Sequence, residues 1–163
     1  MTATPHRYRG VNYASRVEAR WAAFFIRHIK VPTHYQPIDL ANGCTPTFLV
    51  GAESPFLVHV DPVAVTAHDY AEAATTLTHC LDGGLEIPLL IVGVTPLPVF
   101  GQDGSPLAGL VWRPDTRAWY TTYWSREPFG LVANGLAEDR DWITSRWSSA
   151  INEVAGMTIG AQA

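Results

Sequence analysis

Three side chains of the types that bind metal ions or transfer protons lie at spacings that define their directions. His59 and Asp61 alternate along a predicted strand over residues 56–61, so both point to the same face of the strand. Glu18 falls on the apolar face of a predicted helix, where a carboxylate needs a partner. As a set, the three side chains could bind a divalent cation. The structural alternatives are a Glu18 that caps its own helix and a hydrogen-bonded His59–Asp61 pair.

The helix that carries Glu18 has a clear start signal. Ser15 is followed three residues later by Glu18, the spacing of a capping box, in which the serine hydroxyl accepts the third helical N–H and the glutamate reaches back. The sequence predicts a helix over residues 16–30 that ends before Pro32.

The same helix carries a basic stripe. At 100° per residue, four cationic side chains fall within one sector of the helix, and they are Arg16, Arg20, Arg27 and Lys30. Residues 1–30 contain six arginine or lysine residues and one acid, a net charge of +5, so the remaining 133 residues carry −9 of the total of −4. Such asymmetry indicates either a surface for nucleic acid or an acidic partner, or a solvated helix face.

The remaining elements follow from periodicity and turn signals, after an irregular arm over residues 1–12. Together they predict the order α-β-β-β-α-β, followed by a hairpin and a helix. The expected segments are strands over 33–36, 45–50 and 56–61, a helix over 66–81, a strand over 86–94, a hairpin around 113–116 and a helix over 138–154.

Composition and length limit the class of protein. The chain has 163 residues, of which 47% are hydrophobic and 16% charged, which suits one folded domain and excludes a disordered chain. No apolar run is long enough to span a bilayer, and no secretory signal is recognisable, so we expect a cytoplasmic protein without membrane contact. Cys44 and Cys80 have no neighbours at metal-ligand spacing, and we expect both to be reduced and free of metal.

Residues 15–25 (SRVEARWAAFF) resemble the first helix of a group of phage and actinobacterial PD-(D/E)XK nucleases, whose pattern there is SRLEARWAxFF. The family continues with Tyr-Glu-Pro, Pro-Asp-Phe and Glu-Val-Lys motifs. This chain has similar segments in the same order, over residues 35–37, 45–48 and 59–62. The resemblance covers residues 13–94 and implies a restriction-endonuclease-like α/β core with a mixed central sheet flanked by helices, to which residues 95–163 add the hairpin and helix.

The resemblance also implies where the catalytic site would lie and what has changed in it. Glu18 matches the first-helix glutamate, but Thr47 stands where the family has its aspartate. His59 stands in place of the second glutamate and Asp61 in place of the lysine, and the only lysine in the chain is Lys30. We expect Glu18, Thr47, His59 and Asp61 to meet in one shallow pocket, and Asp61 to favour the protonated form of His59.

Three functions remain open. The first is a catalytically inactive nuclease-like domain without a cofactor, encoded by a phage or mobile element and acting in the host cytoplasm. It would bind nucleic acid through the basic stripe, or a protein partner. The second is an active nuclease in which Glu18, His59 and Asp61 bind Mg²⁺, or Mn²⁺ or Zn²⁺ because of the histidine. The third is a structural or inhibitory protein without nucleic-acid contact.

Overall fold

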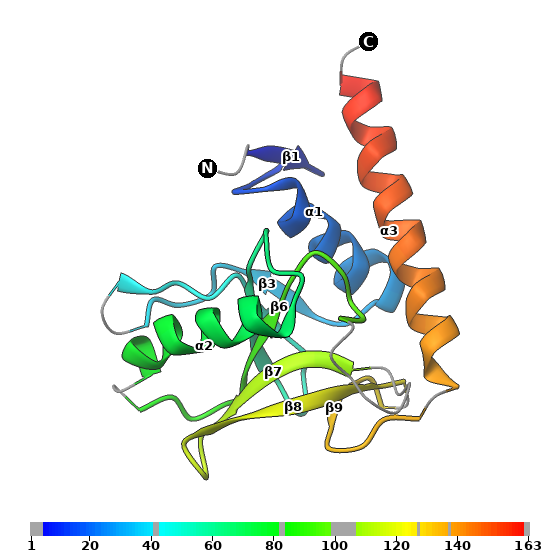
Figure 1. The fold of residues 1–163 in the computed structure, drawn as a ribbon. Helices are drawn as coiled ribbons and strands as arrows, with labels where there is room; N and C mark the ends of the chain where they lie inside the picture. Colours follow the sequence, from blue (N-terminus) through cyan, green and yellow to red (C-terminus); the bar gives the residue numbers. More distant parts are fainter. Residues whose placement is uncertain are drawn as a thin grey trace.

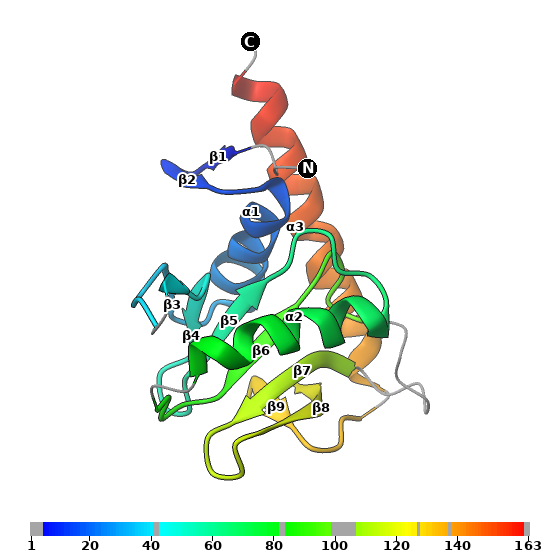
Figure 2. The ribbon, with the colours of Figure 1, turned by 60° about the vertical axis from the view of Figure 1, so that its left-hand side comes forward.

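The structure is a computed structural model, and it describes residues 5–40, 43–81, 84–98, 107–126, 128–136 and 138–161. It is a mixed α/β arrangement in which helices flank a curled seven-stranded sheet (Figures 1 and 2). The helices are α1 (Arg16–Ala23), the π-helix η1 (Phe24–Ile29), α2 (Ala67–Leu81) and α3 (Asp139–Ala161). The strands are β1 (His6–Tyr8), β2 (Val11–Tyr13), β3 (Thr33–Tyr35), β4 (Phe48–Val50), β5 (Phe56–Val60), β6 (Leu89–Val92), β7 (Leu107–Arg113), β8 (Ala118–Ser125) and β9 (Gly130–Val132).

The N-terminal segment differs from the irregular arm that the sequence predicts. Strands β1 and β2 pair antiparallel as a two-stranded hairpin, while residues 1–4 of the predicted arm lie outside the described residues. Gly10 at the tip of the hairpin has a φ of +83°, which glycine adopts without a steric penalty. Tyr8 and Tyr13 are buried against the core, and this packing orders the short hairpin.

The predicted first helix is confirmed, but its second half is a π-helix. Ser15 caps the N-terminus as predicted, since its Oγ accepts from the Glu18 N–H at 3.1 Å. The N–H of Lys30 donates to the carbonyl of Phe25 and closes an i→i+5 turn, with Lys30 in the left-handed region at φ +65°. A π-helical turn advances less than 100° per residue, so side chains after Ala23 point in other directions than the sequence predicts.

The seven strands lie in the order β3-β4-β5-β6-β7-β8-β9. β5 and β6 are parallel, with α2 as the crossover between them, and all other neighbours are antiparallel. The predicted order α-β-β-β-α-β is therefore present as α1, β3, β4, β5, α2 and β6. The predicted hairpin is also present, with β7 and β8 joined by a turn over residues 114–117.

Helices cover both faces of the sheet (Figure 2). α1, η1 and α3 pack on one face around Trp21, which is fully buried and donates its indole N–H to the Gly93 carbonyl at 2.8 Å. Trp147 of α3 lies with its ring centre 4.6 Å from that of Trp21. On the opposite face α2 buries Tyr70 and Leu77 against the sheet. No helix in the described part of the chain is long and apolar enough to cross a membrane.

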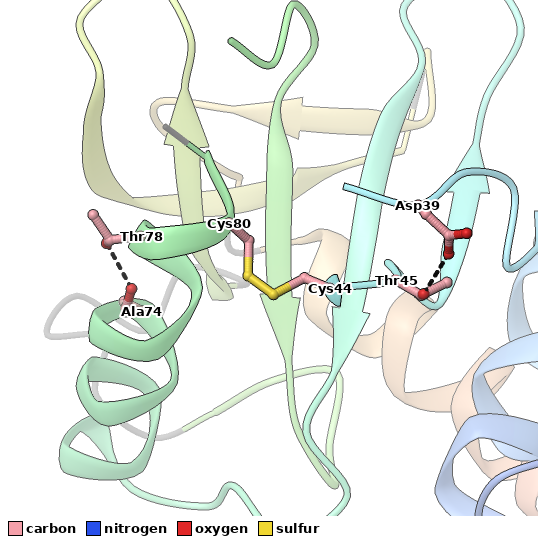
Figure 3. The surroundings of a disulfide bond; sticks show 6 residues. All are labelled: Asp39, Cys44, Thr45, Ala74, Thr78 and Cys80. Atoms are coloured by element: carbon pink, nitrogen blue, oxygen red, sulfur yellow. Dashed lines mark hydrogen bonds between the residues drawn. A yellow bond between two sulfur atoms is a disulfide. The ribbon is translucent and has the colours of Figure 1, made fainter. Parts of the chain in front are cut away.

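The prediction that both cysteines are reduced is wrong, because Cys44 and Cys80 form a disulfide (Figure 3). The α2 crossover returns its C-terminal end to the connection between β3 and β4. The two Cα atoms are consequently 5.9 Å apart, within the range that a disulfide spans. A sequence separation of 36 residues gave no indication of this proximity.

We expect the disulfide to contribute measurably to stability. A cross-link between residues 36 apart restricts the unfolded chain by an amount that corresponds to about 4 kcal/mol in the chain-entropy model. The double variant Cys44→Ser/Cys80→Ser should therefore unfold at a lower denaturant concentration than the oxidised protein. Its free energy of unfolding should be lower by about 2–4 kcal/mol. Adding reductant should shift the wild-type curve towards that of the variant and leave the variant unchanged. Identical curves for the wild type with and without reductant would contradict the cross-link.

Candidate functional site

Glu18 caps its own helix and is held by two hydrogen bonds. Its carboxylate accepts from the Ala14 N–H and from the Tyr35 hydroxyl, both at 3.0 Å. Burial raises the pKa of Glu18 above its ordinary value, although both hydrogen bonds act in the opposite direction. Tyr35 packs beside Tyr13 and Phe48 on the sheet face that α1 covers. Glu18 therefore belongs to that face.

Thr47 is a buried strand-end residue whose polar groups are satisfied. Its hydroxyl accepts from the Val60 N–H at 3.0 Å, and its own N–H donates to the Val58 carbonyl at 2.8 Å. Its carbonyl accepts from the Gln36 N–H. The side chain is thus used to extend the pairing of β4 with β5.

His59 and Asp61 face α2. In β5 the side chains of Phe56, Val58 and Val60 belong to the core under α1, whereas Leu57 belongs to the core under α2. Alternation places His59 and Asp61 with Leu57, and both line a pocket of about 390 Å³ between β5, α2 and the segment before β4. The lining residues are Leu40, Cys44, Thr45, Pro46, His59, Asp61, Val63, Asp69, Glu72, Ala73, Thr76, Leu77 and Leu89.

The predicted convergence of Glu18, Thr47, His59 and Asp61 is consequently wrong. The pocket holds His59 and Asp61, but neither Glu18 nor Thr47 lines it. Glu18 lies with Tyr35 on the sheet face that α1 covers, whereas the pocket lies on the α2 face. Within the described ranges, no three His, Cys, Asp or Glu side chains are grouped so that they could hold a metal ion.

The Asp61 charge favours the protonated form of His59, as expected, but burial has the larger effect on this side chain. Burial lowers the pKa of His59 below its ordinary value, and the nearby Asp61 charge offsets only part of that shift. No residue in the described part of the chain forms a hydrogen bond with the His59 ring. Asp61 does not bond it either, and its Oδ1 accepts from the Val63 N–H at 3.1 Å. The imidazole is therefore neutral near pH 7 and faces the pocket as an uncharged base.

Two further carboxylates of the pocket were not recognised in the sequence. Asp69 lies in the first turn of α2, where its Oδ2 accepts from the N–H groups of Val65 and Thr66 at 2.9 Å. The signal was present, because Thr66 and Asp69 have the spacing of a capping box. Glu72 lies one turn further along α2 and is 3.2 Å from His68. Which side of α2 faces β5 depends on tertiary packing, so the sequence alone did not connect these acids with Asp61.

The predicted basic stripe divides into two parts. Arg16 and Arg20 lie one turn apart on α1, and both of their charges lower the pKa of His6 in the adjacent β1, after the larger effect of burial. Burial and the Arg16 charge lower the pKa of Arg20, whose Nε is buried without a hydrogen-bond partner. Arg27 lies beyond the change to π-helical geometry and pairs with Glu153 of α3 at 3.4 Å.

Glu153 joins β1, the β1–β2 turn and η1 to α3. It accepts from the Tyr8 hydroxyl at 2.8 Å, lies 3.2 Å from the His28 ring nitrogen, and is 3.8 Å from Arg9. Partial burial favours a higher pKa for Glu153, but the hydrogen bonds from Tyr8, Arg27 and His28 outweigh it and hold the pKa below its ordinary value. The acid therefore neutralises part of the positive charge near Arg27, whereas Arg16 and Arg20 have no comparable acid beside them among the described residues.

Comparisons with protein-family models, with curated proteins and with solved structures found no match to this chain. Two features of the structure bear on function. The first is the arginine surface, formed by Arg16 and Arg20 on α1. The second is the pocket on the α2 face, which Asp61, Asp69 and Glu72 line.

The environment of His59 leads to a pH prediction. The His59 imidazole should titrate below pH 6.5, and Asp61→Asn should lower its pKa further because it removes the charge that favours the imidazolium. Since the folded-state pKa is depressed, the His59 contribution to stability should be constant above pH 6.5 and should decrease as the pH falls below that value.

A pH titration of the ring resonances by NMR measures this pKa directly. Asp115→Asn is the control, because Asp115 is exposed on the β7–β8 turn and should leave the His59 pKa unchanged. A His59 that titrates above pH 6.5 would support the predicted His59–Asp61 ion pair instead.

Proposed function

We propose that this chain is a non-cleaving nuclease-like domain that binds the phosphate backbone of nucleic acid through the surface of Arg16 and Arg20. The observation that carries the proposal is the mutual repulsion of these charges. Burial and, to a smaller extent, the Arg16 charge lower the pKa of Arg20, whose Nε is also buried with no hydrogen-bond partner. A phosphate group beside the two arginines would supply the negative charge that offsets their repulsion.

The position of the two arginines suits contact with an extended polyanion. Arg16 is exposed and Arg20 half-buried at the start of α1, beside the β1–β2 hairpin, which carries exposed Arg7 and Arg9 (Figure 1). Contacts of this kind position a protein on nucleic acid without specifying a base sequence. The acidic remainder of the chain would restrict binding to this one end.

The nuclease-like part of the proposal rests on the resemblance of residues 13–94 and on the element order. The succession α1, β3, β4, β5, α2, β6, with a parallel β5–β6 pair, is the order that the resemblance implies. The non-cleaving part rests on the site. Three of the four matching positions have changed, and Glu18 and Asp61 lie on opposite sides of the sheet, where they cannot share a metal ion.

A binding titration tests the arginine surface. Fluorescence anisotropy with labelled duplex DNA, single-stranded DNA and RNA should show affinity that decreases as salt is raised. The double variant Arg16→Ala/Arg20→Ala should weaken binding and reduce the slope of log K against log salt by about 2, since each lost phosphate contact contributes about 0.9 on B-DNA.

The matched control is Arg140→Ala/Arg146→Ala, which makes the same change in net charge. Both residues are exposed on the first turns of α3, at the end away from β1 in Figure 1. Equal losses in the two double variants would indicate a non-specific charge effect, and no binding by the wild type at low salt would refute the proposal.

Cleavage should be absent. We expect no Mg²⁺-dependent cleavage of DNA or RNA above background, because Mg²⁺ is usually held through carboxylates and the matching positions do not assemble them. The lysine that the family uses is also missing, and general acid–base assistance is typically worth about 10²–10⁴-fold in rate. The assay should include Mn²⁺ and Zn²⁺, with Asp61→Ala purified identically as a control for contaminating nuclease. Turnover that is present in the wild type and lost in Asp61→Ala would overturn the non-cleaving assignment.

A further inference from the structure

The pocket on the α2 face is distinct from the arginine surface and has the features of a ligand site. Its volume of about 390 Å³ lies within the range of small-molecule pockets. Leu77 and Leu89, both buried in the core under α2, supply its floor, and Leu40, Val63 and Ala73 add further apolar surface. A ligand would therefore need an apolar body to fill it.

The charged side chains known to line the pocket are all acidic. Asp61, Asp69 and Glu72 contribute three carboxylates, and none of the described residues that line the pocket is an arginine or lysine. In Asp61 the Val63 N–H binds one carboxylate oxygen, so the other oxygen remains available to a ligand. Such a site attracts a cationic donor and repels an anion.

His59 provides a second, independent feature on the β5 side of the pocket. The ring is neutral and is not hydrogen-bonded by any residue within the described ranges, although most of its surface is covered. A partly buried imidazole without a protein partner presents an acceptor nitrogen to whatever occupies the pocket. A neutral imidazole acceptor beside apolar walls favours an organic ligand with an N–H donor over a hydrated metal ion.

The walls of the pocket are held in place before any ligand binds. Cys44 lines the pocket, and its disulfide to Cys80 fixes the segment before β4 against the C-terminal end of α2 (Figure 3). Thr78, in the last turns of the same helix, accepts from the Trp119 indole at 3.1 Å and ties α2 to β8. A preformed site loses less conformational entropy on binding.

We propose that this pocket binds a small organic ammonium ion with an apolar body. The ammonium group is bound by Asp61, with His59 accepting one of its N–H groups. Asp69 and Glu72 add negative potential at the rim. The apolar body of the ligand packs on Leu77 and Leu89. The arginine surface takes no part in this binding.

The test uses three probes of nearly the same shape on the full, oxidised chain. They are 2-phenylethylamine as the cation, 2-phenylethanol as the neutral analogue and 3-phenylpropanoate as the anion. In an NMR titration the amine should shift the backbone resonances of Val63, Ala73 and Thr76, and should bind about tenfold more tightly than the alcohol. The anion should not bind. Lowering the pH should weaken amine binding as His59 becomes protonated.

Variants separate the pocket from general surface charge. Asp61→Asn should weaken amine binding about tenfold, while Asp115→Asn on the exposed turn should leave it unchanged. Thr76→Trp is a second variant at an exposed lining position, and it should abolish binding by filling the pocket even if Asp61→Asn folds poorly. The proposal is overturned if the amine and the alcohol bind alike, if the amine shifts resonances elsewhere, or if Thr76→Trp binds as the wild type does.

Discussion

The alternation of side chains along β5 is the constraint on which the rest of the molecule depends. β5 has neighbours on both edges and a helical layer on each face, so each of its side chains must enter one of two separate environments. Val58 and Val60 enter the core under α1, and Leu57, His59 and Asp61 point to α2. Because Glu18 extends from α1 on the other face, it cannot reach His59 in β5 or Asp61 directly after it.

This separation gives the two halves of the candidate site different chemistry. Glu18 is a half-buried, hydrogen-bonded cap with a raised pKa, in contact with Tyr35 and the chain before α1. Asp61 and the neutral His59 share a pocket with the acids of α2. A nuclease centre requires these groups on one cation, whereas a pocket for an organic cation requires only the second set.

The charge distribution on the other face is decided by a local change of helix type. If α1 continued unchanged, Arg27 would join Arg16 and Arg20 in one stripe. In the π-helical turns of η1, Arg27 instead reaches Glu153 of α3, together with His28 and the Tyr8 hydroxyl. Arg16 and Arg20 have no acid paired with them among the described residues, and the proposed phosphate contact therefore lies at the start of α1.

The sequence by itself determined the features that depend on neighbouring residues. The Ser15 cap, the extent of α2, the hairpin around residues 113–116 and the shared direction of His59 and Asp61 are local consequences of hydrogen bonding, glycine and proline, and strand geometry. Tertiary structure decided what these elements face. The Cys44–Cys80 bond, the acids opposite Asp61, the Arg27–Glu153 pair and the side of the sheet on which Glu18 lies all join residues distant in sequence. Their proximity follows from how α1, α2 and α3 pack on the two faces, and no local pattern specifies that packing.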